Sequence, residues 1–156
     1  MKNKKIKAYK VFDSEWKCRG FKYEVGKTYK LLGENNKLIE PKLCSSGFHA
    51  CLKITDCFSY YSFDPANKVA EVELDGTILG LEGDKQCSNI IKIIKELSWN
   101  DVLYLSNTGL NNTGHSNSGD RNSGDRNSGD RNSGDMNSGD RNSGDMNSGY
   151  MNSGYR

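Results

Sequence analysis

The sequence predicts an α+β head domain over residues 1–106 and a β-solenoid over residues 107–156. Two observations support this division. The first part contains short alternating strands and amphipathic segments, as α+β domains do. The second part repeats one five-residue unit, Asn, then Ser or Thr, then Gly and two variable residues, ten times without a slip. Repeats of fixed period are typical of stacked coils.

Charge is nearly balanced in both parts of the chain. Lys and Arg number 17 against 14 Asp and Glu up to Ser106, and 5 against 6 after it. Proteins that grip the phosphate backbone cluster their Lys and Arg residues, so this composition argues against direct nucleic-acid binding. It argues equally against an acidic mimic of DNA.

Cysteine usage and hydropathy predict a cytoplasmic protein. The five cysteines are an odd number and all precede the repeats, which suits reduced thiols better than a disulfide framework. The segment Met1–Lys5 is charged and lacks the apolar stretch of a signal peptide. No apolar stretch is long enough to cross a bilayer, so we expect no membrane contact.

Alternation of polar and apolar residues predicts the strands of the head. These are Lys7–Phe12, a hairpin of Phe21–Val25 with Thr28–Leu31, and Lys68–Leu74. The segment Gly33–Asn36 has turn composition, and Asp75-Gly76 is expected to end the third strand.

Three helices are expected in the head. The spacing of aromatic and apolar residues predicts one within Leu52–Ser62. In Asn89–Leu97 the apolar residues at 90, 93, 94 and 97 form one stripe, which predicts a second helix. Ser98 followed by Asp101 resembles a capping box and predicts a short third helix through Leu105.

The repeats allow two interpretations. Asn, Ser, Gly and Asp bury little apolar area, which favours a disordered tail. A disordered tail needs no fixed register, however, whereas stacked coils need the same residue at the same place in every turn. Asn amides stacked about 4.8 Å apart are also expected to hydrogen-bond to one another along the stack, in place of an apolar core.

The tract is similar to the pentapeptide-repeat family, closest to its Asn-x-Gly-rich branch. The resemblance implies a right-handed parallel β-helix with four pentads in each square turn. Residues twenty apart would then stack, with Arg121 on Arg141, Arg126 on Met146 and Asp120 on Asp140. The tract has no Leu or Phe at the pentad centre, so the interior is expected to be thin and polar.

The variable positions supply the candidate binding surface. It comprises Asp120, Arg121, Asp125, Arg126, Asp130, Arg131, Asp140 and Arg141. An open solenoid end exposes strand edges that invite pairing with another chain. We therefore expect a homo-oligomer through the last coil, at Tyr150, Met151 and Tyr155.

Metal binding in the head is not predicted. A zinc site would use Cys44, His49, Cys51 and Cys57, but the Cys-x-x-Cys spacing is missing. Half-buried thiols and a His at a strand-to-helix corner are the expected arrangement. The segment Asp120–Asp125 resembles half a calcium loop without the bidentate Glu that completes one, so no calcium site is expected either. No cofactor is predicted.

Gly47-Phe48-His49, followed by an aromatic segment and a strand, weakly resembles the middle of the ADP-ribosyltransferase fold. That family needs an early His or Arg and a late Glu around NAD. The resemblance nominates Arg19, His49 and Glu73 as catalytic candidates.

Two functions follow from these features. The first is a non-catalytic protein whose head and repeats recognise a host protein. Pentapeptide-repeat proteins bind proteins that handle DNA, topoisomerases among them, and a phage or mobile-element inhibitor of a host DNA-handling or defence protein suits this chain. The alternative is an ADP-ribosyltransferase-like head that the repeats assemble into an oligomer.

Overall fold

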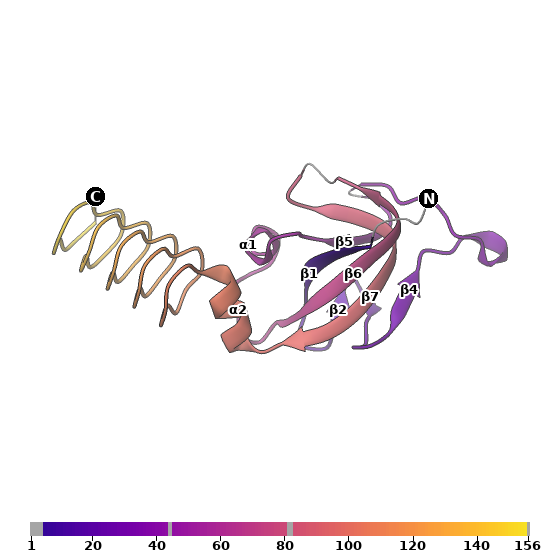
Figure 1. Cartoon of the computed structure of the whole chain (residues 1–156), viewed down its shortest axis with the longest axis horizontal. Helices are drawn as coiled ribbons and strands as arrows, with labels where there is room; N and C mark the ends of the chain where they lie inside the picture. The colour runs from indigo at the N-terminus through magenta and orange to yellow at the C-terminus, as the bar shows by residue number, and fades with distance from the viewer. Residues whose placement is uncertain (1–4, 44, 81–82, 156) are drawn as a thin grey trace. The chain divides into compact units, whose positions relative to one another are not determined.

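The computed structural model describes residues 5–43, 45–80 and 83–155. The chain divides into two compact units, Met1–Ser98 and Trp99–Arg156 (Figure 1). Cys44 and Arg156 lie outside the described residues. No described helix has the length and apolar character needed to cross a membrane.

The first unit is built on an antiparallel sheet around two long strands, β6 (Lys68–Leu79) and β7 (Gln86–Leu97). Strand β1 (Ile6–Phe12) pairs with the free edge of β6. The other edge of β7 is shared by β4 (Thr28–Lys30) and β5 (Phe48–Ala50). Separate short strands, β2 (Lys17–Cys18) and β3 (Phe21–Lys22), form a two-stranded ribbon.

The core of this unit lies between the sheet and the segments that cover it. Small and branched residues of the strands pack together with aromatic residues, and both groups are buried: Ala8, Phe12, Tyr23, Phe48, Ala70, Val72, Leu74, Ile91 and Ile93. Tyr23 contacts the rings of Phe12 and Tyr29 at centroid distances of 5.1 Å each, in the tilted and edge-on arrangements that aromatic pairs prefer.

The predicted helix over Asn89–Leu97 is wrong, because this segment forms most of β7. Four β-branched isoleucines favour the extended backbone. A bulge at Ile94 lies between Ile93, which faces Val72, and Lys95, which faces Glu71. The extra residue breaks the two-residue alternation, so the apolar positions imitate helical spacing.

The predicted hairpin is also wrong. Strand β3 pairs with β2, Cys18 facing Phe21, while β4 pairs with β7. Long-range pairing with the isoleucines of β7 therefore replaces the local partner. The three-residue 3-10 helix η1 (Glu34–Asn36) confirms the turn after β4.

Strand β6 continues past Asp75-Gly76, where the sequence predicted its end. The register with β7 shifts between Asp75 and Ile78, and Gly76 adopts a φ of 72°. The side chain of Asn89 fills the space beside this bulge and accepts a hydrogen bond from the N–H of Thr77 at 2.9 Å. A Cβ at Gly76 would lie 2.1 Å from Asn89 Oδ1, so the position requires glycine.

Two helices complete the described elements. Helix α1 (Ile54–Cys57) is a single turn, shorter than the predicted 52–62 segment. Helix α2 (Trp99–Ser106) confirms the third predicted helix. It belongs to the second unit, where Asn107 Nδ2 donates to the carbonyl of Leu103 at 2.8 Å and the N–H of Ser116 donates to that of Ser106 at 2.9 Å. Helix α2 thus covers the beginning of the repeats.

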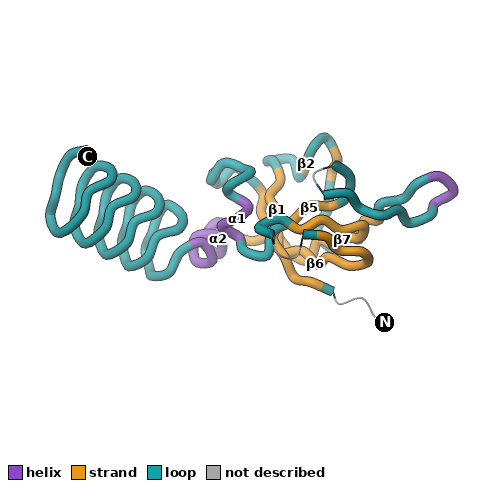
Figure 2. Tube along the Cα trace, turned by 90° about the horizontal axis from the view of Figure 1, so that it is seen from above, coloured by secondary structure: helices purple, strands orange, loops and turns teal. Residues whose placement is uncertain are grey.

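The repeats coil with a period of ten residues, so two pentads make one turn. Parallel bridges join Ser118 to Ser128, Ser128 to Ser138 and Ser138 to Ser148, and the alternate pentads are joined in the same way. The backbone between the bridges is classed as loop (Figure 2). The turn of twenty residues expected from the resemblance is therefore wrong, and residues ten apart stack.

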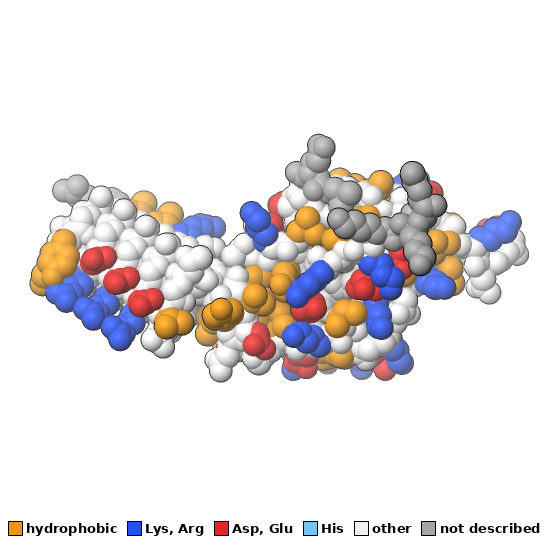
Figure 3. Space-filling view, in the orientation of Figure 1, with side chains coloured by type: hydrophobic (Ala, Val, Ile, Leu, Met, Phe, Trp, Pro, Cys, Tyr) orange, Lys and Arg blue, Asp and Glu red, His pale blue; other side chains and the backbone are white. Residues whose placement is uncertain are grey.

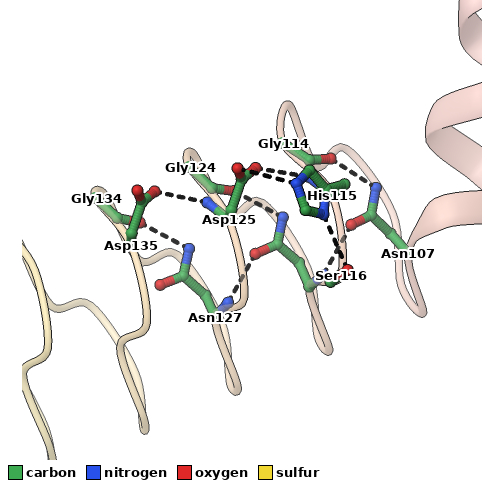
Figure 4. Close-up of polar contacts among 10 residues, drawn as sticks. Asn107, Gly114, His115, Ser116, Gly124, Asp125, Asn127, Gly134 and Asp135 are labelled. Carbon is green, nitrogen blue, oxygen red and sulfur yellow. Dashed lines mark hydrogen bonds and ion pairs between the residues drawn. The ribbon is translucent and has the colours of Figure 1, made fainter. Parts of the chain in front are cut away.

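Asparagine fills the interior of the coil, as the predicted polar core requires. The side chains from Asn117 to Asn142, one every five residues, are 1–2% exposed. Asn127 is representative: its Nδ2 donates to the carbonyl of Gly134 at 2.8 Å, and its Oδ1 accepts the N–H of Asn137 at 2.9 Å. Figure 4 shows this pattern in successive coils. The amides thus bond mainly to the backbone, not to one another as predicted.

Glycine is required because neighbouring coils touch at this position. At Gly124 the φ is 100°, and a Cβ would lie 2.3 Å from the carbonyl oxygen of Gly134. The last residue of each pentad up to residue 151, such as Arg131 with φ of 60°, turns the corner in the left-handed region although it is not glycine. That conformation costs roughly 1 kcal/mol for an ordinary residue.

The Asn bonds generate a stability prediction. Replacing Asn127 by Ala leaves the carbonyl of Gly134 and the N–H of Asn137 without their side-chain partner, at a cost of roughly 1–3 kcal/mol for each buried group. Replacing the exposed neighbour Ser128 by Ala keeps every backbone bond.

We expect Asn127→Ala to lower amide-exchange protection across residues 117–147 in the full chain, and Ser128→Ala to leave it unchanged. Equal protection in the two variants would show that the amides do not hold the coil together.

Candidate functional site

The aspartates of the repeats form two columns that are tied to the backbone. Asp130 Oδ1 accepts the N–H of Asp120 at 2.8 Å, and Asp140 Oδ1 accepts that of Asp130 at 2.8 Å. Asp135 and Asp145 do the same for the other column, which begins at Asp125. One carboxylate oxygen of each bonded aspartate is therefore engaged in holding the neighbouring coil.

The arginines are arranged differently from the expectation of a twenty-residue turn. Arg121, Arg131 and Arg141 follow one another in a single uninterrupted column, since the N–H of Arg131 donates to the backbone carbonyl of Asp120 and that of Arg141 to the backbone carbonyl of Asp130. The opposite column reads Arg126, Met136, Met146. Figure 3 shows a row of basic side chains beside a row of acidic ones along the repeats. We call Arg121, Arg131 and Arg141 the arginine column.

The guanidinium groups of this column are exposed, with about 4.8 Å expected between adjacent coils. Among the described residues, no salt bridge joins a repeat arginine to an aspartate. The eight predicted surface residues therefore divide into two kinds. The aspartates accept backbone hydrogen bonds that hold the coil, whereas the arginines form no described salt bridge and, apart from the contact of Arg141 with Tyr150, no described side-chain hydrogen bond.

The predicted oligomer contacts occupy the same columns one coil further on. Tyr150 follows Asp140, Met151 follows Arg141 and Tyr155 follows Asp145, with exposures of 58%, 64% and 74%. The Arg141 guanidinium hydrogen-bonds to the Tyr150 hydroxyl and lies 5.5 Å from its ring centroid. Aromatic and Met side chains thus replace charge at this end of the described coil.

The first unit contains a separate candidate site, a cavity of about 720 Å³. It is bordered by β1, the loop between β2 and β3, strands β4 and β5, and the segment following α1. Its described lining includes four cations and several aromatic residues: Lys10, Arg19, Lys30, Lys85, Phe21, Tyr23, Tyr29, Tyr60 and Tyr61. No Asp or Glu occurs among these described lining residues. We call this cavity the basic pocket.

The three catalytic candidates are not brought together. Arg19 and His49 line the basic pocket, but Glu73 does not. Glu73 lies on β6 and accepts a hydrogen bond from Lys5 at 2.7 Å, an ion pair at the sheet edge that β1 forms. The arrangement implied by the transferase resemblance is therefore absent from the described residues.

Lys10 is the pocket residue that sequence reasoning missed. It lies on β1 with only 5% of its surface exposed, between the buried residues Ala8 and Phe12. Its Nζ donates to the carbonyl of His49 at 2.8 Å and to Cys18 Sγ at 3.5 Å. The signal was present, because the two-residue alternation of the strand places this lysine on the apolar face.

Three cysteines of the head line the same cavity. Cys18, Cys51 and Cys57 line it, and Cys18 Sγ shares a hydrogen bond of 3.0 Å with the Tyr61 hydroxyl. A hydrogen bond with Cys51 and burial both raise the pKa of the Cys57 thiol. Cys44, the fourth member of the zinc set considered above, lies outside the described residues. No described group of three or more His, Cys, Asp or Glu side chains could hold a metal ion.

The pKa of His49 depends on burial and on the positive charge of the basic pocket. Burial lowers its pKa below the usual 6.5, and the nearby positive charges of Lys10, Lys85 and Arg19 lower it further. The neutral imidazole therefore predominates at pH 7. As the pH falls through 6.5, the unfolded chain gains a proton that the folded chain resists, so this residue reduces stability on the acid side.

We expect an NMR titration to place the pKa of His49 below 6.5, with His115→Gln used to assign the two histidines. Stability should also fall less between pH 7.5 and 5 in His49→Gln than in the unchanged chain, by urea unfolding. A pKa of His49 at or above 6.5 would contradict the positive character of the basic pocket.

Comparison with known proteins finds two families along the chain. Residues 6–105 match a family described as "Domain of unknown function (DUF7666)". Residues 105–140 and 122–155 match "Pentapeptide repeats (8 copies)", which confirms the pentapeptide resemblance and supports a β-helix. The head receives no support as an ADP-ribosyltransferase. Neither the curated proteins nor the solved structures contain a match. The chain therefore belongs to the DUF7666 family, and a pentapeptide-repeat coil follows its family domain.

Proposed function

We propose that this protein is a non-catalytic binding protein whose repeat coil recognises a host protein. The observation that carries the proposal is the arginine column. Arg121, Arg131 and Arg141 recur once per coil, with exposed guanidinium groups and no described salt bridge to an aspartate. Arginine is enriched in protein interfaces because its planar fork binds carboxylates in pairs and stacks on aromatic rings.

A protein suits this surface better than nucleic acid does. A row of aspartates runs beside the arginine column, and phosphates would be repelled by it. A protein surface with alternating acidic and basic side chains would complement both rows. The regular bonding of the coil fixes the spacing of the arginines before binding, which reduces the entropy lost on association.

Several finer features belong to this proposal. The hand of the coil is proposed to be right-handed, by analogy with the pentapeptide-repeat family. The host protein is proposed to handle DNA or to act in defence, and its inhibition is the proposed outcome, in the cytoplasm. Self-association through Tyr150, Met151 and Tyr155 is proposed because these large side chains are exposed together on one coil.

The test is a comparison of variants of equal charge. Arg121, Arg131 and Arg141 are changed together to Gln in the full chain. The control changes Lys37, Lys42 and Lys53, three exposed lysines of the head, to Gln. Each lost arginine contact is expected to cost roughly 0.5–1 kcal/mol, so the triple variant should bind its partner at least about tenfold more weakly.

Proteins retained from a bacterial lysate by the unchanged chain and by the lysine variant, but lost from the arginine variant, would identify the partner for titration. Retention by the arginine variant and by a chain lacking residues 117–156 would contradict recognition through the coil. In that case the variants His49→Gln and Glu73→Gln would show whether the head is responsible.

A further inference from the structure

The basic pocket contains a buried cation, Lys10, that has no carboxylate partner among the residues that the structure describes. Lys10 is 5% exposed, and lysine is seldom buried unless it is paired with a carboxylate. Its described hydrogen-bond partners are the carbonyl oxygen of His49 and the sulfur of Cys18, and neither partner is a carboxylate. The rings of Phe12 and Tyr23 lie 5.6 and 5.7 Å from Nζ and compensate only in part.

Among the described residues, Lys10 Nζ has fewer hydrogen-bond acceptors than it has donors. An ammonium has three donors, and the carbonyl of His49 and the thiol of Cys18 account for two of them. Burying an uncompensated charge is costly, so such a group is expected to meet an anion. Because Lys10 lines an open cavity, that anion can enter from solvent.

Three further cations face the same cavity. Arg19, Lys30 and Lys85 lie on three separate segments of the chain, so the fold concentrates positive charge here from distant positions. Lys85 Nζ lies 4.3 Å from the centroid of the Tyr60 ring. Without acidic residues in the described lining, several unit charges are available to one small ligand. A phosphate matches this arrangement better than a single carboxylate does.

The remaining walls suit a planar ring. Phe21, Tyr29 and Tyr60 line the cavity, and Phe21 and Tyr60 are about half exposed, at 49% and 46%. Aromatic faces of this kind stack on the bases of nucleic-acid components. A volume of about 720 Å³ is within the range of small-molecule sites and is large enough for a mononucleotide.

We propose that the basic pocket binds a nucleoside monophosphate, with Lys10 and Arg19 on the phosphate and the aromatic walls on the base. This inference goes beyond the proposed function, because it concerns another surface and another class of ligand. No reaction of the ligand is required.

Calorimetric titration of the full chain separates the two halves of the ligand. The probes are AMP, GMP, CMP and UMP, the four nucleosides, and inorganic phosphate. We expect at least one nucleotide to bind with a Kd below about 1 mM, and its nucleoside and phosphate alone to bind at least about tenfold more weakly.

Variants assign the binding to this cavity. Arg19→Gln and Lys10→Met should each weaken nucleotide binding about tenfold to a hundredfold, because each removes a charged hydrogen bond. Lys22→Gln removes an exposed charge outside the pocket and should change the Kd less than about twofold. If Lys10→Met fails to fold by circular dichroism, Arg19→Gln and Lys85→Gln decide the matter.

The proposal is overturned if no nucleotide binds below about 1 mM, if a nucleoside binds as tightly as its nucleotide, or if the pocket variants leave the Kd unchanged. Failure here would leave the arginine column untouched, since its variants are scored on protein retention. The two proposals therefore succeed or fail separately.

Discussion

The repeats depend on one interaction, the two hydrogen bonds that each buried asparagine side chain forms with the backbone. In an ordinary coil an apolar side chain would fill the interior and leave backbone groups to other partners. Here each core Asn carries both a donor and an acceptor inward, as in Asn127, and satisfies a carbonyl and an N–H of adjoining segments. Stability thus comes from saturating buried polar groups, since almost no apolar area is available. Glycine contact and aspartate bonding are secondary to this geometry.

The sequence predicted the existence of the two parts and most strands, but not all of their partners. Strands β1 and β6 largely alternate polar with apolar residues, which is enough to predict both. Strand β7 was mistaken for a helix because a single bulged residue, Ile94, shifts the apolar spacing. The pairing of β4 with β7 depends on contacts some sixty residues away, as in Thr28 with Lys92, and no local pattern announces such a partner.

The repeat period shows a different limit. A five-residue unit is evident in the sequence, but the number of units per turn is decided by the corner conformation and by which Asn bonds reach across the interior. The bond from Asn127 to Gly134 spans seven residues and closes the coil after two pentads. The sequence indicates part of the basic pocket, because the transferase resemblance nominates Arg19 and His49, which both line it. Lys10 is the stronger indication of a pocket, since a lysine on the apolar face of a strand is buried.

A coil that closes after two pentads also has a parity. Adding or losing ten residues leaves every column in register, so the tract can lengthen or shorten by whole turns. Adding or losing a single pentad exchanges the two sides beyond that point; a pentad inserted between Arg131 and Met136 would place Met136 in line with Arg121 and Arg131. A change in length by an odd number of pentads would therefore alter the order of charged side chains on the surface, while the buried asparagines would keep their positions.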